Sequence, residues 1–217
     1  MAHKLLTALT AILFLAGDVY SAETKALERE EVRQALSGAD APARRQAAAR
    51  LGEIGVMADT ELLQHALHDE DADTRENAEH AMWQIWTRSG SRQVDRLFEA
   101  GVGQMREGDL HKAIATFSRI IRLKPAFAEG WNKRATLYFL AGEYQKSLAD
   151  CKEVIKRNPA HFGALAGYGQ IYLRLEDYER AREYFHRALE VNPNMDSVRL
   201  NIVLLDKLIE QKRRNMI

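Results

Sequence analysis

Three prolines in the second half of the chain are separated by one constant interval. Pro125, Pro159 and Pro193 follow one another at 34 residues, each directly after Lys or Asn. Proline restricts the residue before it and cannot continue a helical hydrogen-bond ladder, so each proline marks a helix end. A fixed period of this length predicts a repeat architecture, in which each unit buries its apolar side against the next unit.

The residues between the prolines repeat in size as well as in spacing. Apolar residues recur three and four positions apart in both halves of each unit, which predicts a pair of amphipathic helices. A turn signal separates the two halves, as "EGDL", "AGEY" and "LEDY". Small residues in register let the two helix axes approach to about 8–10 Å. The residues in register are Gly101, Ala135 and Gly169 (small) and Phe117, Cys151 and Phe185 (core).

On these positions, residues 94–193 resemble three tetratricopeptide repeats (TPRs), with Trp131 at the family's characteristic place in the second unit. The resemblance implies an all-α fold, a right-handed α-solenoid of antiparallel helix pairs. It also implies that Trp131 and Tyr138 are packing residues. The stretches "GWNKRAT" and "HFGAL" are similar to those of bacterial TPR proteins. The expected TPR domain is 94–217, with units 94–127, 128–161 and 162–195 and a capping helix over 196–214.

In TPR proteins the first helix of each pair lines a concave groove, and its outward residues select the ligand. The resemblance therefore implies a protein or peptide partner. A known TPR mode clamps the C-terminal carboxylate of heat-shock chaperones, but only Lys133 is cationic at the corresponding places Phe98, Val102, Lys133, Gly163 and Gly167, which disfavours that ligand class. The alternative is a groove filled by the preceding helical segment or by the chain's own ends. The candidate groove residues are Asp95, Phe98, Val102, Met105, Arg106, Glu129, Asn132, Lys133, Thr136, Phe139, Leu140, Gly163, Ala166, Gln170, Leu173 and Arg174.

Residues 26–87 carry a second, shorter period. "VRQALSGADAPARRQAAARLGEIG" superposes on "LQHALHDEDADTRENAEHAMWQIW" at an offset of 31. An Asp before an Arg-containing helix, followed by small Ala residues, resembles short HEAT-like repeats. Asp side chains at such places cap the next helix. We expect a HEAT-like pair over 26–87, joined to the TPR units by 88–93.

The N-terminus has the pattern of a secretory signal peptide over residues 1–21. Lys4 precedes an apolar run from Leu5 to Ala16, and small residues flank a cleavage point before Ala22. The run is too short to span a bilayer as a helix. We expect cleavage and export, to the periplasm or beyond, over the alternative of a retained anchor.

Charge and motifs exclude several function classes. Formal net charge is zero, which gives no global attraction to nucleic acid or anionic membranes. The two halves differ, since residues 22–93 are net acidic and residues 94–217 are net basic. The lone Cys151 rules out an intramolecular disulfide and a Cys-rich zinc site, and we expect it to be a buried core residue.

No motif supports catalysis or a metal. The calcium-like stretch 69–80 has Thr74 where the loop needs Gly and His80 where it needs Glu. His65 and His68 lack the HExxH arrangement, and His111, His161 and His186 have no evident shared partner. We therefore expect an exported, non-enzymatic protein-interaction scaffold without cofactor or metal. The rivals are a structural or self-assembling envelope protein and, further off, a metal-dependent hydrolase.

Overall fold

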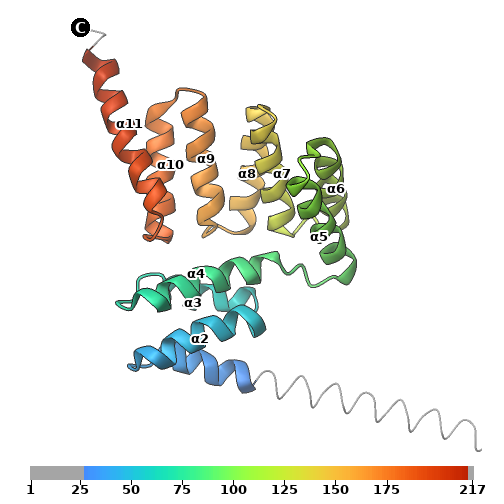
Figure 1. Cartoon of the computed structure of the whole chain (residues 1–217), viewed down its shortest axis with the longest axis vertical. Helices are drawn as coiled ribbons and strands as arrows, with labels where there is room; N and C mark the ends of the chain where they lie inside the picture. Colours follow the sequence, from blue (N-terminus) through green and yellow to red (C-terminus); the bar gives the residue numbers. More distant parts are fainter. Residues whose placement is uncertain (1–26, 215–217) are drawn as a thin grey trace, which may run out of the picture. The chain divides into compact units, whose positions relative to one another are not determined.

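The computed structural model describes residues 27–214, and the chain divides into two compact units, Met1–Ile85 and Trp86–Ile217. All regular structure in the described residues is helical, which confirms the all-α class (Figure 1). The predicted signal peptide lies outside the described residues. The first unit holds a helix over 27–36, α2 (Ala41–Ile54), the 3-10 turn η1 (Met57–Asp59), α3 (Thr60–Ala66) and most of α4 (Ala72–Thr87). The second holds α5 (Arg92–Arg106), α6 (Leu110–Leu123), α7 (Ala128–Leu140), α8 (Tyr144–Arg157), α9 (Phe162–Arg174), α10 (Tyr178–Val191) and α11 (Asp196–Arg214).

The first unit repeats its helix starts at the offset read from the sequence. Asp40 accepts the Ala43 N–H at the start of α2, at 3.0 Å. Asp71, 31 residues later, accepts the Thr74 N–H at the start of α4, at 2.9 Å. The expected aspartate capping of these helix starts is therefore present.

An arginine in each of these helices also ties back the loop before it. Arg44 donates to the carbonyl of Ala39 at 2.8 Å, and Arg75 donates to the carbonyl of Glu70 at 3.0 Å. The 31-residue period is thus a period of structure as well as of sequence. The HEAT-like assignment itself stays a prediction.

In the second unit, α5 packs with α6, α7 with α8, and α9 with α10, as adjacent pairs in Figure 1. Each first helix ends with a hydrogen bond that closes the last turn, from Asp109 N to Gln104 O, from Glu143 N to Tyr138 O and from Asp177 N to Tyr172 O, at 2.8–3.0 Å. This closure needs a left-handed residue just before the donor. Gly108 and Gly142 fill that place with φ of 77° and 74°. The third unit has Glu176 there, at φ 58°.

The repeated small residues admit the repeated large ones. A Cβ built on Gly101 would lie 2.8 Å from the Phe117 ring, and one on Gly169 would lie 2.5 Å from the Phe185 ring. Both rings are fully buried. In the middle unit the small residue is Ala135, and Cys151 stands where the ring would be. The pairs α5–α6 and α9–α10 therefore approach closely because glycine faces phenylalanine.

Two packing predictions have different outcomes. Cys151 is a buried free thiol, as expected. Its burial, and to a lesser extent the negative charge of Asp150, raise the pKa of the thiol to about 12. Trp131 is only partly buried. Its Nε1 donates to the Pro125 carbonyl at 2.9 Å, and the guanidinium of Arg157 lies 4.8 Å from its ring. Trp131 therefore packs at the surface of the repeat and is not a fully buried core residue, because solvent reaches part of its ring.

Helix α11 covers the last pair with one side and leaves another side bare. Val198, Ile202, Leu205 and Ile209 are buried, and the first three join the core cluster around Phe185. The basic C-terminal residues are exposed, as predicted. Leu200, Val203 and Leu204 are exposed as well, at 70%, 52% and 49%.

Candidate functional site

Helices α5, α7 and α9 bring most of the predicted groove residues to two hollows. The first hollow, about 410 Å³, has Phe98, Val102, Met105 and Arg106 from α5 and Lys133 from α7 on its wall, with Thr87 beside them. The second hollow, about 150 Å³, lies between α7 and α9. Its predicted members are Asn132, Thr136, Phe139, Gln170 and Gly163.

The first hollow is apolar at its base and basic at its rim. Val102 and Met105 are partly buried against the core of the first helix pair. Phe98 is more buried than its role as an exposed anchor requires, since its ring makes edge contacts with Phe117 and Phe127, each at 5.7 Å between centroids. Phe98 is thus mainly a core residue, and only a small exposed part of it lines the hollow.

The remaining predicted groove residues line neither hollow. Asp95 accepts hydrogen bonds from the Ser89 N–H at 2.9 Å and the Ser89 hydroxyl at 2.5 Å, so it fixes the junction before α5. Leu140 is exposed, Leu173 and Ala166 pack on the core of the last pair, and Arg174 lies 6.0 Å from the Phe139 ring.

Glu129 corrects the sequence interpretation most sharply. It was expected to face a ligand, but its side chain has no solvent exposure. Its carboxylate accepts from Asn132 Nδ2 at 3.1 Å and pairs with Lys133 Nζ at 3.0 Å. Asn132 is itself buried, so it too does not face outward freely. Such partners offset the free-energy cost of burying a charged carboxylate.

His161, the N-cap residue of α9, completes this buried network. Its Nδ1 accepts the Ala164 N–H at 3.1 Å, which caps α9, so the neutral ring carries its proton on Nε2. Nε2 lies 2.9 Å from Glu129 Oε2 and donates to it. Burial alone would raise the pKa of Glu129, but the hydrogen bond from His161 and the charge of Lys133 outweigh burial and hold that pKa below its ordinary value.

Trp86 stacks on the other side of this histidine. The ring centroids of Trp86 and His161 are 4.4 Å apart at an interplanar angle of 20°, and Phe162 lies 5.1 Å from Trp86. The indole is almost fully buried. Trp86 therefore packs on the N-terminal end of α9.

Reading the repeats in register could have found His161. It stands 34 residues after Phe127, which is the N-cap residue of α7. A histidine at a helix N-cap has a ring nitrogen able to accept a backbone N–H. The pairing of His161 with Glu129 is not in the pattern, because it joins the starts of α7 and α9, which are 32 residues apart.

Similarity to known proteins was found for the same stretch. Models described as tetratricopeptide repeat match residues 98–161 and 138–200. Residues 98–200 are tetratricopeptide repeats. A TPR repeat-containing protein of Rhizobium etli is 34% identical over 108 residues, which is 50% of this chain and 53% of that protein. Anaphase-promoting complex subunit 3 of Schizosaccharomyces pombe is 31% identical over 83 residues, 38% of this chain and 12% of that protein.

Solved TPR structures have the same fold at low identity. The first TPR domain of Spaghetti (RPAP3), bound to an HSP90 peptide, aligns with TM-score 0.54 and 21% identity over 55% of this chain and 95% of that one. The Sgt2 TPR domain from Aspergillus fumigatus aligns with TM-score 0.54 and 22% identity over 57% of this chain and 83% of that one. The chain spans about half or less of the length of the curated relatives named above.

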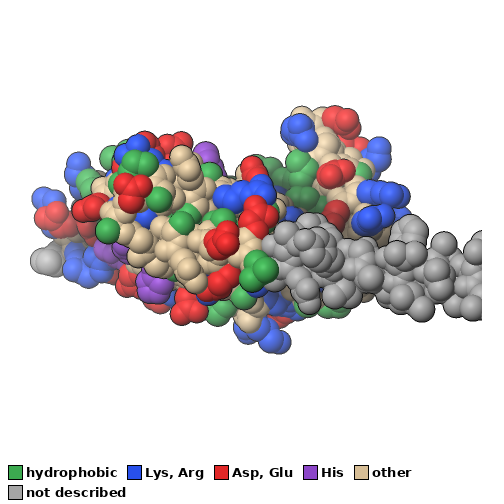
Figure 2. All heavy atoms as spheres, turned by 90° about the horizontal axis from the view of Figure 1, so that it is seen from below, with side chains coloured by type: hydrophobic (Ala, Val, Ile, Leu, Met, Phe, Trp, Pro, Cys, Tyr) green, Lys and Arg blue, Asp and Glu red, His purple; other side chains and the backbone are tan. Residues whose placement is uncertain are grey.

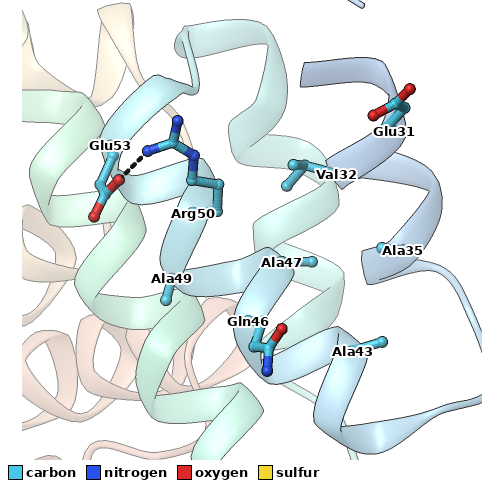
Figure 3. Close-up of a pocket in the computed structure, with 9 residues that line it drawn as sticks. All are labelled: Glu31, Val32, Ala35, Ala43, Gln46, Ala47, Ala49, Arg50 and Glu53. Atoms are coloured by element: carbon cyan, nitrogen blue, oxygen red, sulfur yellow. Dashed lines mark hydrogen bonds and ion pairs between the residues drawn. The ribbon is translucent and has the colours of Figure 1, made fainter. Parts of the chain in front are cut away.

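Other surfaces of the described residues show less. A further hollow, about 610 Å³, lies in the first unit, where Ala43 and Ala47 of α2 face Val32 and Ala35, with Arg50 bonded to Glu53 beside them (Figure 3). Figure 2 shows one face of the molecule, on which acidic and basic side chains are interspersed. Within residues 27–214, no helix is long and apolar enough to cross a membrane, and no group of three His, Cys, Asp or Glu side chains is arranged to hold a metal.

Proposed function

We propose that this chain is an exported, non-enzymatic scaffold that binds a segment of another protein along α5, α7 and α9. The observation that carries the proposal is the first hollow, with an apolar base at Val102 and Met105 and the cations Arg106 and Lys133 at its edge. Apolar anchors beside the exposed cation Arg106 fit a peptide segment that brings apolar and acidic side chains. The structural neighbours titled as complexes of TPR domains with HSP90 and HSP70 peptides support a ligand of this class.

We expect the ligand to be an internal segment of its protein and not a chain terminus. Among the five places that clamp a terminal carboxylate in chaperone-binding TPR domains, only Lys133 is cationic. Its ammonium group already pairs with the buried Glu129 carboxylate at 3.0 Å. A second carboxylate would compete for a charge that is largely compensated.

The test is selection of ligands from a random 12-residue peptide library displayed on phage, followed by fluorescence anisotropy with the selected peptides. Val102→Gln with Met105→Gln should weaken binding by tenfold or more, because both side chains lie on the hollow's base. Leu123→Gln with Leu175→Gln is the control, since these are exposed apolar residues away from both hollows. Circular dichroism must show both variants folded. Equal affinity of the two double variants would refute the groove assignment.

Export is tested separately. Fractionation of cells and N-terminal sequencing should find a chain beginning at Ala22 in the envelope or the medium. A full-length chain in the cytosol would refute it.

Self-assembly is a second candidate, favoured by the bare side of α11. Leu200, Val203 and Leu204 are exposed on the last helix of the array, where a capping surface is ordinarily polar. Light scattering after size exclusion should then show a mass that rises with concentration and falls in Leu200→Glu. A monomer at all concentrations excludes this role.

A further inference from the structure

The second hollow owes its existence to a departure of the middle unit from its neighbours. In the first and third units a phenylalanine ring fills the space between the paired helices, against Gly101 and Gly169 respectively. In the middle unit that place holds Cys151, whose side chain is much shorter than a phenylalanine ring. The space left over lies above Cys151 and opens between α7 and α9.

Small residues on α9 keep the hollow open. Gly163 and Gly167 are one helical turn apart, so both face the hollow, and Ala135 lies opposite on α7. A Cβ on Gly167 would stand 3.7 Å from the Cys151 sulfur, an ordinary contact. Glycine is therefore not forced on α9 by packing at this position, and any larger side chain would occupy the hollow.

The lining fits an apolar group. Cys151, Ala135 and Ile171 form the base and are almost fully buried. The Ser147 hydroxyl on the same wall already donates to the Ala135 carbonyl at 2.7 Å. No charged side chain is among the residues that line it within the described part of the chain. A charged group placed there would lose its hydration without a partner.

The volume limits the size of that group. A hollow of about 150 Å³, lined by both apolar and polar residues, has room for one group of at most about the size of benzene. The side chains of valine, leucine and isoleucine are smaller than this limit. Gln170, which also lines the hollow, carries an amide suited to the backbone of an extended segment, whereas the Asn132 Nδ2 is already bonded to Glu129.

We propose that the second hollow binds one branched aliphatic side chain, of valine, leucine or isoleucine, from an extended peptide segment lying along α7 and α9. This inference rests on the proposed function and adds the specificity of one subsite to it.

The peptides selected on the wild-type protein supply the probes. Their alignment should show one position dominated by Val, Leu or Ile, and replacing that residue by Ala should weaken binding about tenfold or more, as expected for losing a buried aliphatic group. Gly167→Leu fills the hollow. It should therefore weaken binding of the parent peptide, and the parent peptide and its Ala-substituted counterpart should then bind with equal affinity. Gly103→Leu is the control, because that helical glycine has open space around it.

A second variant closes the hollow by the solution that the other units use. Ala135→Gly with Cys151→Phe gives the middle unit the glycine–phenylalanine pair of its neighbours, and it should abolish the aliphatic preference as Gly167→Leu does. A measurement without any variant is the shift of the ¹³C-labelled Ile171 methyl signal, which the parent peptide should move and its Ala counterpart should not.

The outcomes separate the two proposals. Peptides that bind the groove but show no aliphatic position, or that bind Gly167→Leu as tightly as Gly103→Leu, overturn the subsite and leave the proposed function standing. A dominant aromatic or charged position also overturns it. If the wild-type protein selects no peptide, the proposed function falls, and the subsite falls with it.

Discussion

Replacing Gly169 by alanine tests whether the contact between glycine and phenylalanine is what holds the third helix pair together. An added Cβ would lie 2.5 Å from two atoms of the Phe185 ring and 2.8 Å from a third. Overpacking of a tight core costs about 1–3 kcal/mol of unfolding free energy. The change also removes a helix-interior glycine, which alone would stabilise α9 by about 1 kcal/mol. The expected net result is a loss of about 0–2 kcal/mol.

The sign of the effect should depend on Phe185. Phe185→Cys by itself creates a cavity at a fully buried site and should cost about 3–5 kcal/mol, the range for truncating a buried aromatic ring. In that background the alanine methyl no longer meets a ring, so Gly169→Ala should raise stability by about 1 kcal/mol through helix propensity and partial filling of the cavity. The double variant reproduces the Ala135–Cys151 pair of the middle unit.

Urea unfolding followed by circular dichroism measures the four proteins of this cycle. The coupling free energy between the two sites is the destabilisation of the double variant minus the sum of those of the two single variants. The comparison requires that the m-value be the same for all four proteins. Gly103→Ala serves as the control for helix propensity, because nothing lies within 4 Å of a Cβ there, and it should stabilise in every background. If Gly169→Ala stabilises the wild-type protein as much as Gly103→Ala does, then the close approach does not constrain position 169 and the packing argument is refuted.

Three further predictions concern single residues. Glu176→Gly should raise the unfolding free energy by about 1 kcal/mol in urea titrations, because Glu176 adopts the left-handed φ of 58° that glycine takes at the equivalent turns, and a loss of stability would contradict this. The pKa of Glu129 is held low in the folded state, so its contribution to stability should be complete above about pH 5 and be lost as pH falls through the folded pKa. Unfolding titrations of Glu129→Gln between pH 3 and 7 should therefore show a shallower acid loss than the wild-type protein, and equal slopes would exclude the buried pair as its cause. The Cys151 thiol, with its pKa raised to about 12, should react with an aromatic disulfide reagent only after urea unfolds the protein, and fast reaction of the folded chain would show that the site is open.

Periodicity predicted the helices of the second unit well because their determinants are local. The Lys-Pro and Asn-Pro steps end α6, α8 and α10 two residues before each proline. The glycine of "EGDL" and "AGEY" supplies the left-handed residue that closes α5 and α7. Each of these effects acts within a few residues of the signal, so a single sequence contains it.

The candidate groove was predicted less well because it depends on contacts between units. Thr136 and Phe139, on the face of α7 expected to point outward, line the second hollow, and Asn132 lines it too although it is buried beside Glu129. Glu129 lies on the same helix and was given the same role, but it pairs with His161 at the start of α9 and is buried. Helical periodicity gives the direction of a side chain relative to its own axis, and it does not say whether another unit covers it.

Comparison of the units in register carries information about the site that the shared pattern lacks. Three of the positions at which one unit departs from the pattern each have their own physical result. Cys151 in place of phenylalanine leaves a hollow between α7 and α9. His161 in place of Phe127 caps α9 and holds the Glu129 carboxylate. Glu176 in place of glycine puts strain into a turn. Conforming positions are explained by stacking alone, since every unit needs them to pack, so the selectivity of this array is to be sought first where one unit departs from the other two.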